Sequence, residues 1–180
     1  RARFDLQTGH SADWPGLRRI QSPEEVSDVY EDVMRTARVV NYCAELIGPN
    51  IRFHHGKVNS KLPGSGTAVK WHQDFGTYHR VDGVPRPDGI MIAVFLDDIT
   101  PCNAPVLAIP GSHKHGLVSE ASQDPTSEDF EAVSRYRFDI QPERLASLTA
   151  EHGGEPIMGP KGSVLILDMT VVHGSTVNIT

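Results

Sequence analysis

The chain has 180 residues, of which 38% are hydrophobic and 22% charged, as in an ordinary globular protein with room for one sizeable core. Its formal net charge of −6 disfavours non-specific binding to nucleic acid or to an anionic membrane surface. No apolar run is long enough to span a membrane. From the charge and the lack of such a run, we expect neither a nucleic-acid nor a membrane partner. The two cysteines, Cys43 and Cys102, are too few for a disulfide framework and indicate reduced thiols in a cytoplasmic protein.

The N-terminal part of the sequence predicts a helical layer. Residues 1–21 carry no regular hydrophobic period and are expected to be irregular. A helix is predicted to begin at Ser22, which can cap it, with Pro23 at the first helical position and Glu25 completing a capping box. Apolar residues then recur at the helical period, which indicates one long helix, or two with a break, over about 22–48. Its one-sided apolar face is expected to pack on a sheet.

Beyond residue 50 the sequence is dominated by short strand-like runs. They cover residues 51–59, 67–75, 89–96, 105–109, 162–169 and 171–173, with loops at 61–66 and 78–88. The intervening segment 117–160 is polar and has weak helical signals around 127–137 and 142–151. Many short strands beside one helical layer predict a mainly β protein, either a β-sandwich or a jelly roll with helices on one side.

The sequence WHQDF at residues 71–75 contains the first candidate metal ligands. On a strand, residues i and i+2 share a face, so His72 and Asp74 are predicted to project side by side. His173, at the end of another apolar run, supplies a third candidate. Two histidines and one carboxylate with open positions form the ligand set of non-haem Fe(II) oxygenases. An H-x-D pair alone is more often an ordinary surface or core pair, and the distal histidine is what strengthens the metal hypothesis.

Several motifs together resemble the phytanoyl-CoA dioxygenase family of Fe(II)/2-oxoglutarate oxygenases. The resemblance extends over most of residues 50–180 and rests on content, order and spacing. The matching motifs are KVNSK at 57–61, WHQDF at 71–75, VFLDD at 94–98, IPGSHK at 109–114, GSVL at 162–165 and HGS at 173–175. The loop at 74–85 is similar to that of ectoine and amino-acid hydroxylases, but it departs from the ectoine pattern at Gly76 and Tyr78.

This resemblance implies a double-stranded β-helix, that is, a jelly roll, and a hydroxylase. His72, Asp74 and His173 would hold Fe(II), 2-oxoglutarate would fill two further positions, and O2 would take the last. An unactivated C–H bond of a small polar metabolite, such as an amino acid or a natural-product intermediate, would be hydroxylated with release of succinate and CO2. An aspartate at position 74 favours hydroxylation, because the superfamily's halogenases have a small residue there.

The resemblance also assigns roles around the iron. Ser175 and Asn59 match positions that bind 2-oxoglutarate, although a surface hydroxyl and a strand-end amide are the ordinary interpretations of such residues. Phe75, Tyr78 and His79 follow the metal strand and are expected to border the substrate pocket. For Phe75 and Tyr78, packing in the protein interior is the alternative interpretation.

The whole chain is expected to form one oxygenase domain that is incomplete at both ends. The helical layer at about 22–48 would flank a jelly-roll core at about 51–116 and 161–180. The segment at about 117–160 would be a lid that excludes water from the site. In this family an arginine after the HGS segment holds the distal carboxylate of 2-oxoglutarate, so the natural protein is expected to continue past Thr180 and to supply it.

Two other functional classes remain open on the sequence. A non-catalytic jelly-roll binding module would need neither iron nor 2-oxoglutarate, and a cupin-type metalloenzyme would bind iron without using the keto acid. The remaining histidines are weaker candidates. His54 and His55 alternate on a predicted strand, and His113 and His115 flank a Pro-Gly-Ser turn that is structural in the family, so we do not expect them to bind a metal.

Overall fold

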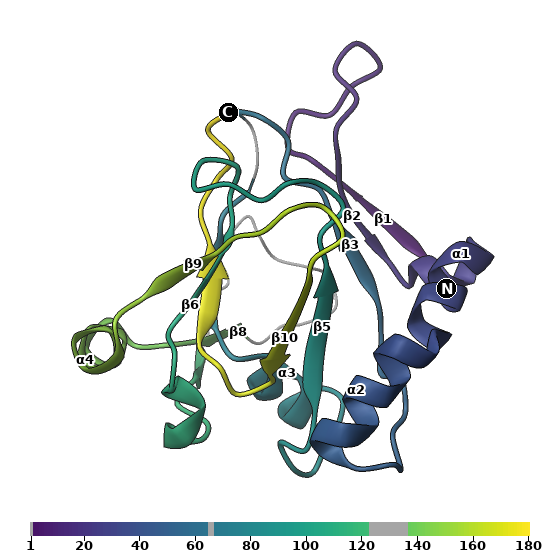
Figure 1. The fold of residues 1–180 in the computed structure, drawn as a ribbon. Helices are drawn as coiled ribbons and strands as arrows, with labels where there is room; N and C mark the ends of the chain where they lie inside the picture. The colour runs from purple at the N-terminus through teal and green to yellow at the C-terminus, as the bar shows by residue number, and fades with distance from the viewer. Residues whose placement is uncertain (1, 65–66, 123–136) are drawn as a thin grey trace. The chain divides into compact units, whose positions relative to one another are not determined.

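The computed structural model describes residues 2–64, 67–122 and 137–180 (Figure 1). The chain falls into two compact units. The first unit comprises Arg1–Thr67 with Val177–Thr180, and the second comprises Ala68–Thr176. All strand pairs of the described residues are antiparallel, so the prediction of a mainly β protein is confirmed. Among the helices of these residues, none combines the length and the hydrophobicity that crossing a membrane requires.

The first unit contains a three-stranded sheet in the order β1-β2-β3. Its strands are β1 (Arg3–Leu6), β2 (Leu17–Gln21) and β3 (Lys57–Asn59). The prediction that residues 1–21 are irregular is therefore wrong. The hairpin is held by the carboxylate of Asp5, which accepts hydrogen bonds from Arg3, Arg19 and Gln21. These partners are polar, and a search for hydrophobic periodicity does not detect them.

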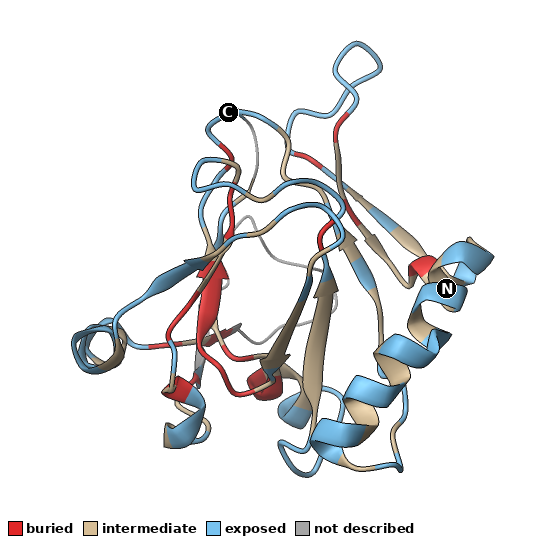
Figure 2. Cartoon of the chain, viewed as in Figure 1, coloured by how far each residue is buried: buried red, intermediate tan, exposed pale blue. Residues whose placement is uncertain are grey.

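Helical structure in the first unit begins later than the sequence predicts. Ser22 has a left-handed backbone with φ of 50° and makes no side-chain cap, and η1 (Pro23–Glu25) is a single 3-10 turn. The proposed capping box at Ser22 is therefore wrong. Of the two alternatives, two helices with a break is confirmed: α1 (Asp28–Arg35) and α2 (Ala37–Ile47) meet at Thr36, whose hydroxyl donates to the Val33 carbonyl. Both helices have no buried residue (Figure 2).

The second unit carries the remaining strands in three sheets, a four-stranded one in the order β4-β11-β6-β9 and the pairs β10-β5 and β7-β8. The strands are β4 (Val69–His72), β5 (Ile90–Val94), β6 (Val106–Ala108), β7 (Glu120–Ser122), β8 (Arg137–Asp139), β9 (Glu155–Ile157), β10 (Val164–Asp168) and β11 (His173–Ser175). The helices are α3 (Asp74–Arg80), the 3-10 helix η2 (Ser112–His115) and α4 (Pro142–His152).

The core of the second unit lies against the four-stranded sheet. Ile109, Leu148 and Val172 are completely buried and cluster with Ile140. Trp71 packs against this cluster from the end of β4. Figure 2 shows the buried residues concentrated on β11 and the segments beside it. Since Leu148 belongs to α4, its burial in this cluster anchors that helix on the core. The presence of α4 confirms the helix predicted over 142–151.

The predicted strands all correspond to strands of the structure, with shorter or shifted ends. The largest difference concerns the metal-site strand, which was expected over 67–75. β4 ends at His72, and Asp74 is the first residue of α3. Tyr78 and His79 consequently belong to this helix and not to a loop. The helical signal around 127–137 falls almost entirely on residues outside the described part of the chain.

Candidate functional site

The two candidate histidine ligands lie on neighbouring strands of the four-stranded sheet. β11 pairs with β4 on one side, where His173 lies directly opposite His72, and with β6 on the other. The centroids of the two imidazole rings are 4.3 Å apart and the rings are tilted by 49°. Directly opposed residues of an antiparallel pair have adjacent side chains, so sheet register brings together two residues that are distant in sequence.

Asp74 reaches the histidines from a helix start. The prediction that it shares a strand face with His72 is wrong, because Gln73 is the extended N-cap residue and Asp74 begins α3. Its carboxylate nevertheless returns to the strand end, with Oδ1 3.6 Å from Nε2 of His72. The ligand atoms of His72, Asp74 and His173 all lie within 4.8 Å of one another. The structure therefore brings the three predicted ligands together.

Backbone carbonyls orient both imidazole rings. Nδ1 of His72 lies 2.8 Å from the Lys70 carbonyl oxygen, and Nδ1 of His173 lies 3.0 Å from that of Val171. A carbonyl can only accept, so each Nδ1 carries the proton and each Nε2 carries the lone pair. This is the usual way in which a protein fixes the tautomer of a metal-binding histidine.

His173 is buried, and its environment favours the neutral imidazole. Burial and the neighbouring His72 lower its pKa below the ordinary value, whereas Asp74 and the Val171 carbonyl act in the opposite direction. Neutral imidazole is the form that binds metals, so the site holds this ring in the required state.

The sequence interpretation missed Gln73, which lies between two candidate ligands. Its side chain is completely buried and makes four hydrogen bonds to the backbone. Nε2 donates to the carbonyls of Gly116 and Thr170, at 2.8 and 2.6 Å. Oε1 accepts from the N–H groups of Val118 and Ser119, at 2.8 and 3.0 Å. Nothing local in the sequence marks this residue, because its four partners belong to Gly116, Val118, Ser119 and Thr170, which are distant from it in the chain.

The predicted substrate residues lie on α3. Phe75 is buried and stacks on His79, with ring centroids 5.1 Å apart. His79 is exposed and its Nδ1 lies 2.7 Å from the Val84 carbonyl oxygen. Burial and the nearby carboxylates of Asp74 and Asp82 raise the pKa of Tyr78, so this phenol stays protonated in the physiological range.

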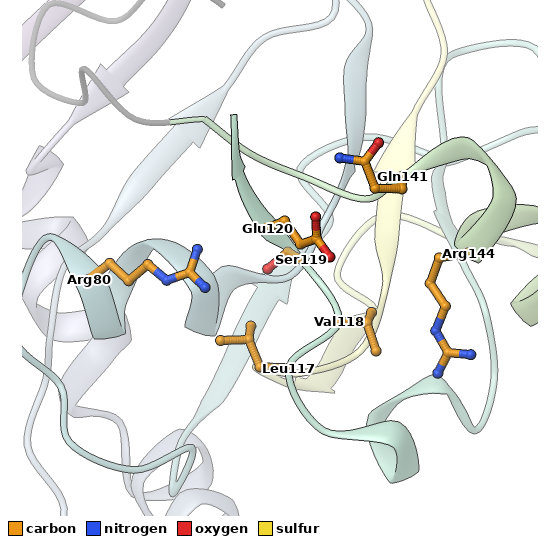
Figure 3. Close-up of a pocket in the computed structure, with 7 residues that line it drawn as sticks. All are labelled: Arg80, Leu117, Val118, Ser119, Glu120, Gln141 and Arg144. Carbon is orange, nitrogen blue, oxygen red and sulfur yellow. The ribbon is translucent and has the colours of Figure 1, made fainter. Parts of the chain in front are cut away.

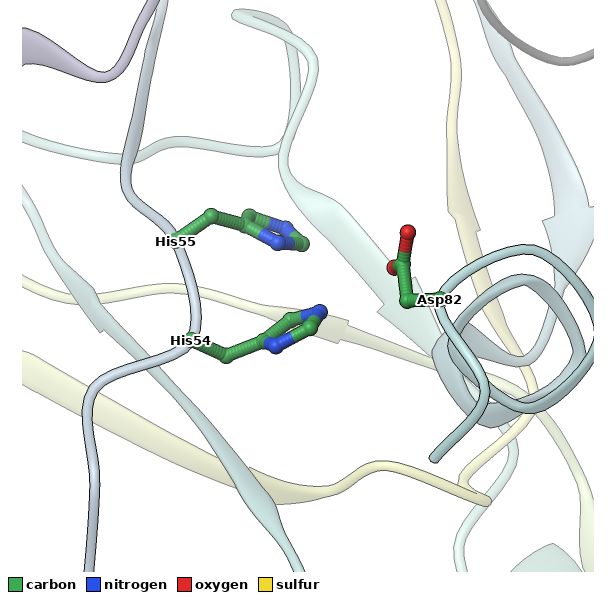
Figure 4. A group of neighbouring side chains, drawn as sticks. All are labelled: His54, His55 and Asp82. Atoms are coloured by element: carbon green, nitrogen blue, oxygen red, sulfur yellow. The ribbon is translucent and has the colours of Figure 1, made fainter. Parts of the chain in front are cut away.

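The two residues predicted to bind 2-oxoglutarate lie in different units. Ser175 is the last residue of β11, two positions after His173, and pairs with Val106 of β6. Asn59 is the last residue of β3 in the first unit and pairs with Arg19. In the same unit, His54 and His55 place their ring centroids 4.7 Å apart (Figure 4).

A pocket of about 370 Å³ lies beside α3 in the second unit (Figure 3). Its lining residues are Arg80, Leu117, Val118, Ser119, Glu120, Gln141 and Arg144. The Ser119 hydroxyl is buried and has no hydrogen-bond partner among the described residues. A Cβ atom added to Gly76 would lie 2.5 Å from this hydroxyl oxygen, so the lack of a side chain at position 76 leaves room for Ser119. No motif in the sequence indicates this pocket.

Known proteins share both the sequence pattern and the fold. A family model described as phytanoyl-CoA dioxygenase (PhyH) matches residues 8–180. An L-proline trans-4-hydroxylase from Streptomyces griseoviridis is 29% identical over 177 residues, which cover 96% of this chain and 65% of that protein. A probable alpha-ketoglutarate-dependent hypophosphite dioxygenase from Stutzerimonas stutzeri is 33% identical over 162 residues, covering 90% and 52%.

Among solved structures, EctD from S. alaskensis is similar in two forms. Its crystal structure with 2-oxoglutarate and 5-hydroxyectoine has a TM-score of 0.77 and 29% identity, covering 93% of this chain and 53% of EctD. The form with bound Fe has a TM-score of 0.76 and 28% identity, covering 98% and 56%. The chain thus spans between about half and two thirds of the length of these relatives. Because the family model covers nearly the entire sequence, the chain belongs to the phytanoyl-CoA dioxygenase family.

Proposed function

We propose that the protein is an Fe(II)- and 2-oxoglutarate-dependent dioxygenase that hydroxylates a small polar metabolite. The observation that carries the proposal is the convergence of His72, Asp74 and His173, with both Nδ1 atoms bonded to backbone carbonyls. Membership of the family and the similarity to EctD support it.

The residues at the site fit an iron ion. Two imidazole nitrogens and one carboxylate oxygen would hold the metal and leave positions for a bidentate co-substrate and for O2. With 2-oxoglutarate and O2 bound, iron would supply the oxidative decarboxylation of the keto acid to succinate and CO2 and the hydroxylation of a C–H bond. The chain itself supplies ligand geometry, a fixed tautomer at each histidine and a buried Gln73 that secures the segment between the two ligands on β4 and α3.

Two residues are proposed to bind 2-oxoglutarate. Ser175 shares a strand face with His173, because the two are separated by one residue in β11, so its hydroxyl is directed to the same side as the ligand imidazole. A hydroxyl there can donate to a carboxylate of the co-substrate. Asn59 is proposed for the same role from the family pattern of its KVNSK motif.

Helix α3 is proposed to border the substrate. Since Asp74 opens this helix, Tyr78 lies one turn beyond the candidate ligand and presents a protonated hydroxyl. The buried Phe75 supports the exposed ring of His79 by stacking. The names of the relatives favour a small substrate, since they refer to proline, hypophosphite and 5-hydroxyectoine.

For the fold we propose a double-stranded β-helix within a single oxygenase domain. The antiparallel sheets β4-β11-β6-β9 and β10-β5 support this assignment, as does the similarity to EctD. The segment 117–160 is proposed to act as a lid, although residues 123–136 lie outside the described part of the chain. We further propose a cytoplasmic location, which the two free thiols of Cys43 and Cys102 support.

The experiment is a succinate assay with 2-oxoglutarate, run with and without Fe(II) across a panel of amino acids and other small metabolites. Wild-type protein should form succinate only with iron, and Asp74→Ala should abolish it. His113→Ala, at an exposed histidine, is the matched control and should retain activity. Metal-dependent turnover that does not require 2-oxoglutarate would instead support a cupin-type metalloenzyme. Failure to bind either iron or 2-oxoglutarate would support a binding module.

A further inference from the structure

A second cluster of metal-binding side chains lies away from the candidate iron ligands, where η2 approaches the end of α4. His115 is the last residue of η2, and His152 is the last residue of α4. With Glu151 they form a group whose ligand atoms lie within 4.8 Å of one another. All three belong to the second unit. The sequence analysis set His115 aside with His113 as part of a structural turn and missed this group, since His115 lies more than thirty positions before Glu151 and His152 in the printed sequence.

The three nearest ligand atoms form one compact triangle. Nε2 of His115 lies 3.0 Å from Nε2 of His152, and Oε1 of Glu151 lies 3.6 Å from the first and 3.3 Å from the second. A point equidistant from all three lies about 1.9 Å from each in their plane, and tetrahedral zinc with bonds of about 2.0–2.1 Å needs ligand atoms about 3.3 Å apart. An ion slightly out of this plane would therefore reach all three atoms after shifts of a few tenths of an ångström.

The surroundings also suit a cation. The side chains of His115 and His152 are 26% and 21% exposed and that of Glu151 is 53% exposed, so the imidazoles are partly shielded while solvent reaches the group and could supply water as a fourth ligand. His152 lies in the last turn of α4, where the helix dipole favours positive charge. Its ring packs on Gly111: a Cβ atom there would lie 3.1 Å from Nδ1, and φ of +80° also favours glycine. The turn before η2 thus permits the close approach.

We propose that His115, Glu151 and His152 form a second divalent-cation site, for Zn²⁺ or a similar borderline metal, separate from the candidate iron centre. Two imidazoles and one carboxylate are ligands that zinc accepts, whereas Mg²⁺ and Ca²⁺ prefer oxygen. A bound ion would link the C-terminal end of α4 to η2. The same side chains without an ion would be joined by an imidazole–imidazole hydrogen bond, which is the competing explanation of their contact.

The test compares zinc stoichiometry and affinity in wild-type protein and variants, by calorimetric titration with Mg²⁺ as a negative control. Removing one ligand with His152→Ala or His115→Ala should remove one equivalent of bound zinc. His113→Ala, a substitution on the same 3-10 helix, should bind as wild type. The variant His72→Ala lacks one ligand of the proposed iron site and should still bind one equivalent of zinc at the second site. The double variant His72→Ala/His152→Ala should lose that equivalent as well.

Glu151→Gln keeps both imidazoles and the shape of the side chain, so it guards against a folding defect as the cause of lost binding. It should weaken zinc binding by at least about tenfold, because the carboxylate supplies the only negative charge of the three ligands. Equal zinc stoichiometry in wild type and His152→Ala, or unchanged affinity in both His115→Ala and Glu151→Gln, would overturn the proposal. The result does not depend on the proposed hydroxylase function, because the equivalent lost with His152 is counted separately from any metal bound at His72.

Discussion

Replacing Gln73 with leucine should destabilise the second unit and disturb the candidate iron site. The change retains side-chain size but removes all four hydrogen bonds to the backbone. The Thr170 carbonyl and the Ser119 N–H are in the interior, and losing their partner costs about 1–2 kcal/mol each. The Gly116 carbonyl and the Val118 N–H are only partly buried and add about 0.5 kcal/mol each.

These contributions sum to about 3–5 kcal/mol, and burying leucine in place of an amide offsets about 1 kcal/mol. We therefore expect a loss of about 3 kcal/mol in the free energy of unfolding. Urea denaturation followed by the fluorescence of Trp71, which packs against the core, measures it, with exposed Trp14 replaced by phenylalanine. Succinate formation should fall by about 100-fold, because Gln73 lies between His72 and Asp74 and a displacement of catalytic groups by about 1 Å has effects of that size.

Glutamate at position 73 separates hydrogen bonding from shape. Its carboxylate can still accept from Val118 and Ser119 but would face the carbonyls of Gly116 and Thr170 without a proton to donate. The folded protein should therefore raise the pKa of this carboxyl, and the destabilisation should grow as pH rises above about 4. Gln141→Leu, at an exposed glutamine, is the control. A loss below about 1 kcal/mol for Gln73→Leu would refute the reasoning.

Three further substitutions test separate contacts. Although partial burial raises the pKa of Asp5, its hydrogen bonds, including those from Arg19, lower it from 3.8 to about 2, so Asp5→Asn should cost about 1–2 kcal/mol at pH 7. Because a depressed pKa stabilises only above the unfolded value, urea titrations should show this difference disappearing between about pH 4 and pH 2. Gly76→Ala should lower the melting temperature through its clash with Ser119, and adding Ser119→Ala should restore most of the loss. Gly174→Ala would place Cβ 2.9 Å from the backbone oxygen of Val69, so calorimetry should show a loss of about 1–3 kcal/mol that no side-chain change relieves.

The sequence predicted those parts of the structure that depend on local pattern or on ordered motifs. Apolar runs located β3, β4, β5, β6, β10 and β11, and the helix over 142–151 was recognised from its local signal. The motif order selected His72, Asp74 and His173, and the structure brings them together, although binding of iron by these residues stays a prediction. Strand ends were less accurate because hydrogen-bond pairing, not composition, decides where a strand stops.

Features that depend on non-local contacts were not predictable. The hairpin of β1 and β2 is held by a polar network around Asp5, which periodicity does not record. Gln73 is an ordinary polar residue in the sequence, and only the fold shows that it satisfies four backbone groups. His115 and His152 come together because η2 and the end of α4 meet, and no spacing rule in the sequence links them.

One segment connects the two candidate metal centres within the second unit. Residues 109–119 leave β6, pass through η2 with His115, and continue to the backbone groups that Gln73 holds. At its start, the Ile109 N–H donates to the Val172 carbonyl, and the Ser112 hydroxyl accepts from the Val172 N–H, at 3.0 and 2.9 Å. Val172 directly precedes His173, so both ends of the segment are bonded to residues adjacent to candidate iron ligands. An ion at His115 would therefore restrain the same backbone that positions the iron site, and zinc binding there should be reflected in the affinity for iron when the two are measured together.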